Sequence, residues 1–159
     1  MTIDSWIRNY LEEQKRVMDA LPVNRVIEII EKFIEANKNE KQIFVFGNGG
    51  SASEAAEKPF KCLSLNECTS LITAIGIDYA YEDIFVKQLK NFANPGDLLL
   101  TMSVSGSSLN LVKAIEWARE KDLYTIALVG GKQGTLYQLA DHVITVDSPH
   151  YGRVEDLHM

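Results

Sequence analysis

The stretch that decides the fold is residues 97–121, Asp-Leu-Leu-Leu-Thr-Met-Ser-Val-Ser-Gly-Ser-Ser-Leu-Asn-Leu-Val-Lys-Ala-Ile-Glu-Trp-Ala-Arg-Glu-Lys. Its first part is a short continuous apolar run, which predicts a strand buried on both faces. Its last part spaces apolar residues three and four apart, which predicts an amphipathic helix. A buried strand that leads through a short loop into a helix is the unit of a parallel α/β sheet.

The same alternation continues on both sides of this stretch. Strands are predicted at residues 42–46, 61–65, 70–74, 97–103, 124–129 and 142–146, and helices at 51–58, 79–92, 107–121 and 135–140. Because strands and helices alternate, we predict an α/β fold with a doubly wound parallel sheet, flanked by helices and joined by right-handed crossovers.

Two helices are predicted before the first strand, at residues 4–21 and 23–36, separated by Pro22. Asp4 or Ser5 can cap the first of them. We expect a helical hairpin over residues 1–40, an α/β core over 41–159 and a single domain over 1–159. The hairpin either covers the domain or forms an oligomer seam through the apolar residues of its first helix, Trp6, Tyr10, Val17 and Met18.

Composition excludes several classes of protein. The chain has 159 residues, 46% hydrophobic and 24% charged, with a net charge of -6. An acidic chain has no global basic field, so we expect no nucleic-acid partner and no membrane partner. The absence of a long apolar run or a signal peptide predicts a cytoplasmic location. The spacing of Cys62 and Cys68 matches no metal or redox motif, which favours reduced structural thiols.

A glycine-rich loop, residues 46–51 (Phe-Gly-Asn-Gly-Gly-Ser), joins the first predicted strand to a helix. Glycines let backbone N–H groups converge on an anion at the start of a helix. Ser51 could donate its hydroxyl to the same anion. A simple capping box formed by Ser51 and Glu54 is the alternative, and the two interpretations are compatible.

A serine-rich loop, residues 103–108, follows the strand of the opening stretch. Its four hydroxyls and one glycine at a helix start can surround phosphate oxygens without a basic residue. Capping of the helix explains Ser107 or Ser108 but leaves Ser103 and Ser105 unexplained. A third glycine-rich turn, residues 129–134, lies after the next strand and could close over a ligand.

Asp78 is the fourth candidate, because it stands at the start of the predicted helix 79–92. It could accept hydrogen bonds from sugar hydroxyls near the sheet edge. The alternative is an ordinary acidic partner of the helix dipole.

Together these segments resemble the sugar isomerase (SIS) domain family, and within it the phosphoheptose isomerases. The resemblance rests on residues 47–52, 71–79, 103–108 and the segment from Ala140 onward. It implies the SIS fold, a homotetramer, and an aldose-ketose isomerase that interconverts sedoheptulose 7-phosphate and D-glycero-D-manno-heptose 7-phosphate through an enediol. By position it implies substrate contacts from Asn48, Gly49, Gly50, Ser51 and Asp78, and phosphate contacts from Ser103, Ser105 and Ser108.

The pattern departs from the family at its proton-transfer residues. In phosphoheptose isomerases a His follows the glycine loop, with a Glu four residues later; here Glu57 stands at the His position and the Glu is absent. Glu155 replaces a Gln, and the final His of the family would lie beyond Met159. We therefore expect residues to be missing at 57–60 and after 159. Glu57 is the remaining catalytic candidate, and Glu57 with Glu155 is a candidate zinc-ligand pair.

Two further functions stay open. One is a non-catalytic SIS protein that binds sugar phosphates or regulates a partner. The other is dinucleotide binding, because Gly47, Gly49 and Ala52 partly match the dinucleotide fingerprint. The serine loop has no role in the latter, so no nucleotide cofactor is expected. His150 and His158 could replace the missing His, but histidines near a chain end are more often surface residues, and His142 is expected to be structural.

Overall fold

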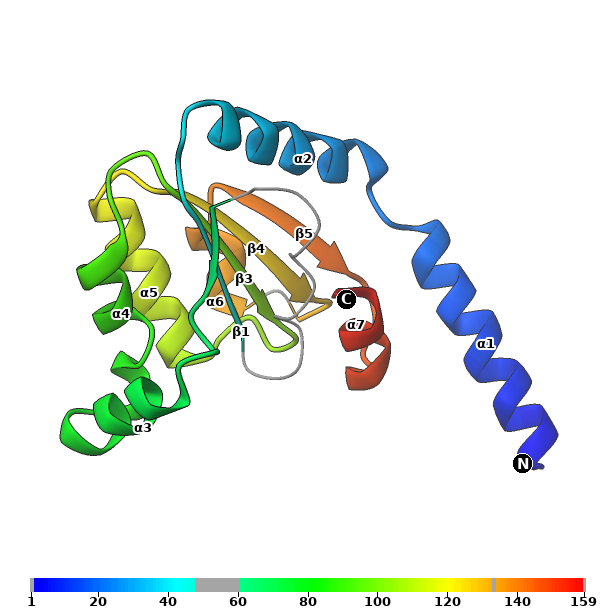
Figure 1. Ribbon diagram of the computed structural model, residues 1–159. Helices are drawn as coiled ribbons and strands as arrows, with labels where there is room; N and C mark the ends of the chain where they lie inside the picture. Colours follow the sequence, from blue (N-terminus) through cyan, green and yellow to red (C-terminus); the bar gives the residue numbers. More distant parts are fainter. Residues whose placement is uncertain (1, 48–60, 133, 159) are drawn as a thin grey trace.

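The computed structural model describes residues 2–47, 61–132 and 134–158 and shows a five-stranded, wholly parallel sheet (Figure 1). The strand order is β2-β1-β3-β4-β5. The strands are β1 (Ile43–Gly47), β2 (Cys62–Ser64), β3 (Leu98–Ser103), β4 (Tyr124–Gly130) and β5 (His142–Val146). The prediction of a parallel α/β sheet is confirmed, and the carboxyl ends of β1, β3 and β4 lie side by side in the register.

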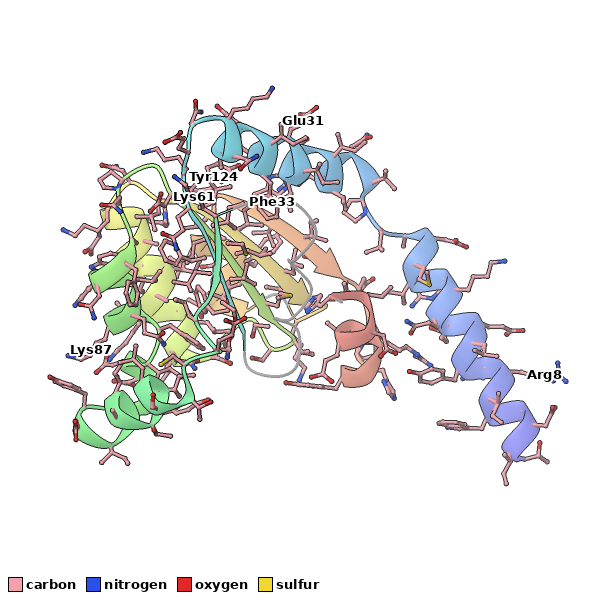
Figure 2. The ribbon with its side chains drawn as sticks, in the orientation of Figure 1. Arg8, Glu31, Phe33, Lys61, Lys87 and Tyr124 are labelled. Atoms are coloured by element: carbon pink, nitrogen blue, oxygen red, sulfur yellow. The ribbon has the colours of Figure 1, made fainter. Side chains whose placement is uncertain are left out.

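Helices cover both faces of the sheet (Figure 1). They are α1 (Ile3–Asp19), α2 (Val23–Lys38), α3 (Thr69–Asp78), the 3-10 helix η1 (Tyr81–Asp83), α4 (Val86–Phe92), α5 (Leu109–Glu120), α6 (Gly134–Leu139) and α7 (Tyr151–His158). The larger core joins one face of the sheet to α3, α4, α5 and α6. On the other face α2 packs through Ile29, Ala36 and Phe33. Figure 2 shows Phe33 directed from α2 towards the sheet and Glu31 on the outer side of this helix.

Two predicted elements were wrong. Residues 70–74, predicted as a strand, lie inside α3, where the Thr73 hydroxyl donates to the Thr69 carbonyl at 3.0 Å. A short continuous apolar run does not distinguish a strand from a buried helix, and this run was misread for that reason. The helix predicted at residues 79–92 is instead η1 followed by α4. The helix predicted at 51–58 lies outside the described residues.

The first two helices form as predicted but do not close into a hairpin. Figure 1 shows α1 leaving the end of α2 and extending away from the sheet. Thr2, rather than Asp4 or Ser5, caps α1, because its side chain accepts a hydrogen bond from the Ser5 amide. Val17 is buried inside the chain against Val146 and Val154, so it is not available for the predicted oligomer seam.

Side chains at the strand ends complete the fold. Thr125 donates its amide and hydroxyl to the Asp141 carboxylate at 2.9 and 2.7 Å, which ties β4 to the start of β5. His142 is buried in β5 with Nε2 at 3.1 Å from the Arg25 carbonyl, which confirms its structural role. Both cysteines are free thiols. In the described part of the chain, no helix has the length and apolar character needed to cross a membrane.

Candidate functional site

The serine loop is held in one conformation by its own hydroxyl groups. The Ser103 hydroxyl accepts from the Gly106 amide at 3.1 Å and lies 3.5 Å from the Ser105 hydroxyl. Gly106 has a φ of 65°, a left-handed conformation that glycine adopts at little cost. Ser108 is the N-terminal cap of α5 by backbone geometry, yet its side chain makes no capping hydrogen bond. Capping therefore does not use the Ser108 hydroxyl, which removes the simpler explanation for it.

The third turn supports the serine loop from the side. The Leu136 amide donates to the Gly106 carbonyl at 2.8 Å, and the Thr135 amide donates to the Ser107 hydroxyl at 3.4 Å. A side chain at Gly134 would overlap the backbone of Gly106. The turn that we predicted as a ligand cover thus anchors the phosphate loop in the described structure.

Gly47, where the glycine loop begins, is fixed by a residue that sequence reasoning missed. The Asn66 amide group donates to the Gly47 carbonyl at 2.8 Å and accepts from the Gly47 amide at 3.1 Å. A single asparagine in a loop after a short strand gives no sequence signal for this role. Five predicted site residues lie outside the described residues, namely Asn48, Gly49, Gly50, Ser51 and Glu57.

Two pockets flank the serine loop. One, of about 440 Å³, lies between η1 and the start of α5 and is lined by Ala80, Tyr81, Glu82, Ser108, Leu109 and Asn110. The other, of about 350 Å³, is lined by Ser107, Lys132, Gly134, Thr135, Tyr137 and Gln138. Glu82 on the first pocket is paired with Lys113, whose pKa is raised by hydrogen bonds to Glu82 and Asp83. The start of α5, with its positive dipole end, therefore borders open space large enough for a small anion.

Asp78 does not open a helix as predicted. It is the last residue of α3 and is exposed. Ala80, in the extended segment that leads from α3 into η1, lines the pocket beside Ser108. The structure thus brings the α3–η1 connection to the serine loop, while a contact of Asp78 with sugar stays a prediction.

The described residues do not form a metal centre. Within residues 2–47, 61–132 and 134–158, no group of three or more His, Cys, Asp or Glu side chains gathers as metal ligands. Glu155 is exposed on α7, and its predicted partner Glu57 is outside these ranges. These residues do not fit a zinc site, because a zinc ion requires at least three protein ligands.

His158 is buried, contrary to the expectation that it is a surface residue. Its exposed fraction is 9%, because α7 packs its last turn against the sheet. Burial lowers the pKa of the imidazole to about 4, although a hydrogen bond to the Val129 backbone opposes this effect. The imidazole is therefore neutral at physiological pH. Two apolar positions of α7, Val154 and Leu157, gave a weak sequence signal for this docking.

Protonation of His158 is expected to destabilise the protein in acid. The pKa is about 4 in the folded chain against an ordinary 6.5, so the unfolded state binds more protons between these values. This contribution to stability is complete above pH 6.5 and is lost as the pH falls towards 4. At pH 4.5 we expect a loss of about 2 to 3 kcal/mol relative to pH 7.5. Urea unfolding of wild type and His158→Asn at both pH values measures it, and an equal pH dependence of the two proteins contradicts it.

Comparison with known proteins identifies the family. Residues 6–130 match the SIS domain family model. The chain belongs to the SIS domain family. Over 96% of its length it is 34% identical to a probable phosphoheptose isomerase of Thermoplasma acidophilum, of which it covers 91%. Over 99% of its length it is 32% identical to a phosphoheptose isomerase of Aneurinibacillus thermoaerophilus, of which it covers 88%. This SIS chain therefore stands with the phosphoheptose isomerases, as the resemblance indicated.

Solved structures agree with this assignment. The SIS chain superposes on a phosphoheptose isomerase from Neisseria gonorrhoeae with a TM-score of 0.92, at 28% identity, covering 99% of this chain and 92% of the other. The corresponding enzyme from Francisella tularensis gives 0.90 at 27% identity, with the same coverage. The alignment to the Aneurinibacillus relative runs over 175 residues and is longer than the 159-residue chain, so that relative contains residues without a counterpart here. This agrees with the expectation that residues are missing relative to the family.

Proposed function

We propose that the protein is a phosphoheptose isomerase, which interconverts sedoheptulose 7-phosphate and D-glycero-D-manno-heptose 7-phosphate. Two lines of support agree. Relatives that carry this name are 30% or more identical over nearly the whole chain. The serine loop also provides a built anion site at the carboxyl edge of a parallel sheet, where ligands of such sheets bind.

The serine loop is the observation that carries the proposal. Ser103, Ser105 and Ser108 present hydroxyl groups at the start of α5, which can donate to phosphate oxygens while the helix dipole stabilises the negative charge. Because the chain is acidic overall, such local donors are the means by which it can hold a dianion. Holding the phosphate fixes one end of the substrate and limits where its carbonyl end can lie.

The isomerisation itself moves one proton from C1 to C2, or back, through an enediol. A carboxylate with access to both carbons can carry this proton. Glu57 is our proposal for that group, on its position after the glycine loop. Zinc stays a prediction from the resemblance; because the described residues do not form a zinc site, we route no step through a metal.

Turnover tests the proposal. Sedoheptulose 7-phosphate is incubated with the protein, and the anomeric proton of the aldose product is followed by NMR. We expect the aldose to accumulate to an equilibrium that is independent of protein concentration. Binding of the sugar phosphate without turnover, with and without added Zn²⁺, would favour the non-catalytic SIS protein instead.

We also propose that the chain forms a homo-oligomer, a homotetramer by the resemblance, through the outer faces of its first two helices. On α2 the exposed residues Val23, Ile27, Ile30 and Ile34 follow one another at helical spacing, opposite the face that packs on the sheet. On α1 a second exposed apolar set comprises Ile3, Trp6, Ile7, Leu11 and Met18. Exposed apolar surface of this extent is typical of an interface. Trp6 and Met18 of the predicted seam are thus on this surface, whereas Tyr10 contacts α7. A cytoplasmic location stays a prediction.

Charges placed in the apolar stripe of α2 are expected to dissociate the oligomer. Ile27→Lys with Ile34→Lys should give monomers in light scattering, because an unpaired charge is costly to bury at an interface. Asn24→Lys with Glu31→Lys is the matched control, since it adds two lysines at the same spacing outside the stripe. Equal masses for wild type and the stripe variant would remove α2 from the interface.

A further inference from the structure

His158 lies next to the phosphate loop although it is 50 residues away in sequence. Figure 1 shows α7 beside the carboxyl ends of β4 and β5. The imidazole is hydrogen-bonded to the backbone of Val129, and Val129 is the register partner of Ser103 on the neighbouring strand. Neighbouring strands are about 4.8 Å apart. The ring is therefore anchored one strand away from the first residue of the serine loop.

Packing of α7 reinforces this placement. Val154 and Leu157 of α7 form one apolar cluster with Val104, the residue that follows Ser103. A side chain at Gly130 would overlap the Val104 carbonyl, so the end of β4 and the serine loop are in direct contact. Neither loop can shift without displacing the other or the helix end that carries His158.

The hydrogen-bonding state of the ring follows from its contacts. Nε2 of His158 is buried and has no hydrogen-bond partner among the described residues. The nitrogen that bonds the Val129 backbone is therefore Nδ1. Facing a carbonyl oxygen, Nδ1 carries the proton, which leaves the lone pair of the neutral imidazole on Nε2. Nε2 is thus a hydrogen-bond acceptor that faces away from Val129.

A buried acceptor without a partner costs stability, and such groups in folded proteins usually have a reason that a bound ligand or water supplies. A sugar phosphate carries several hydroxyl donors close to its phosphate. With the phosphate at the serine loop, these donors would lie within the reach of groups at the ends of β3 and β4.

We propose that Nε2 of His158 accepts a hydrogen bond from a hydroxyl group of the bound sugar phosphate. The inference rests on the proposed function and adds to it a substrate-binding residue on α7. His158 in this role recognises the polyol chain of the substrate, while the serine loop recognises its phosphate. As a neutral acceptor with its proton held on Nδ1, it orients the substrate and transfers no proton.

Two substitutions separate this role from a purely structural one. The side-chain amide of His158→Asn can take the place of Nδ1 and donate to the Val129 carbonyl, but it lacks an acceptor at the Nε2 position. The longer amide of His158→Gln reaches the Nε2 position with its carbonyl oxygen and loses the Nδ1 donor. His150→Asn is the control, since His150 is exposed just before α7.

The dissociation constant for sedoheptulose 7-phosphate, measured by titration whether or not turnover occurs, distinguishes the roles. We expect His158→Asn to weaken binding about tenfold, as loss of one hydrogen bond does, while its urea midpoint stays near wild type. His158→Gln should recover most of the affinity despite lower stability. Wild-type affinity in His158→Asn, or a loss only in His158→Gln, would overturn the inference.

A measurement on the wild-type protein keeps the test independent of how the variants fold. The ¹⁵N resonance of Nε2 should move on saturation with sedoheptulose 7-phosphate and stay in place with inorganic phosphate alone. An unmoved resonance in a protein that binds and turns over the sugar overturns the role of His158 and leaves the proposed function intact. A protein that neither binds nor converts the sugar phosphate refutes both.

Discussion

Gly130→Ala is expected to lower kcat/KM for sedoheptulose 7-phosphate about 100-fold. A Cβ atom at this position would overlap the carbonyl oxygen of Val104 and lie 3.3 Å from its carbonyl carbon. Both are backbone atoms, so the overlap cannot be relieved by a side-chain rotation. The serine loop must move, and a displacement of about 1 Å at a binding group can cost two orders of magnitude in rate. Overpacking of this kind also costs about 1 to 3 kcal/mol of stability.

Steady-state kinetics and urea unfolding measure these effects. Gly152→Ala is the matched control, because its Cβ would lie 3.5 Å from the nearest atom, the Cε1 of His150, which is an ordinary contact. We expect this control to retain wild-type kinetics. A Gly130→Ala protein with unchanged kcat/KM would show that the contact between β4 and the serine loop does not position the substrate.

Removal of two hydroxyls from the serine loop should weaken phosphate binding strongly. Ser105→Ala with Ser108→Ala leaves intact the bond from the Gly106 amide to the Ser103 hydroxyl, which shapes the loop. A hydrogen bond to a charged group contributes about 1.5 to 3 kcal/mol. We therefore expect KM for the sugar phosphate to rise about 100-fold or more, with a parallel rise in the inhibition constant of inorganic phosphate.

Ser107→Ala is the control for this experiment. Its hydroxyl accepts from the Thr135 amide at 3.4 Å, and it is not one of the three serines assigned to phosphate. A small change in KM is expected, within about threefold, since a weak neutral hydrogen bond is lost. Equal effects of the double variant and the control would place the phosphate elsewhere.

Local patterns predicted those parts of the fold that local chemistry determines. The runs that became β1, β3, β4 and β5 are rich in apolar residues and end at glycine or serine, so their identity as buried strands followed from sequence. Residues 69–78 failed, because their apolar residues are nearly continuous and both helix and strand bury such a run. The missing information was tertiary: α3 packs on the core only through Leu71, Ile72 and Ile75.

The candidate site divides in the same way. Ser103, Ser105 and Ser108 could be predicted because a loop between a strand and a helix draws them together within six positions. Asn66 and His158 could not, since their roles depend on contacts with Gly47 and Val129, which are distant in sequence. The direction in which α1 leaves α2 also depends on packing, through Val17 and the Tyr10 hydroxyl, which lies 3.3 Å from Asp156.

The most direct test of the central claim compares sedoheptulose 7-phosphate with sedoheptulose in D₂O. If the phosphate anchors an enediol isomerisation at the serine loop, the phosphorylated sugar should give aldose that carries solvent deuterium at C2, while the free sugar gives essentially none. Absence of aldose from the phosphorylated sugar, or equal conversion of both sugars, would contradict the account.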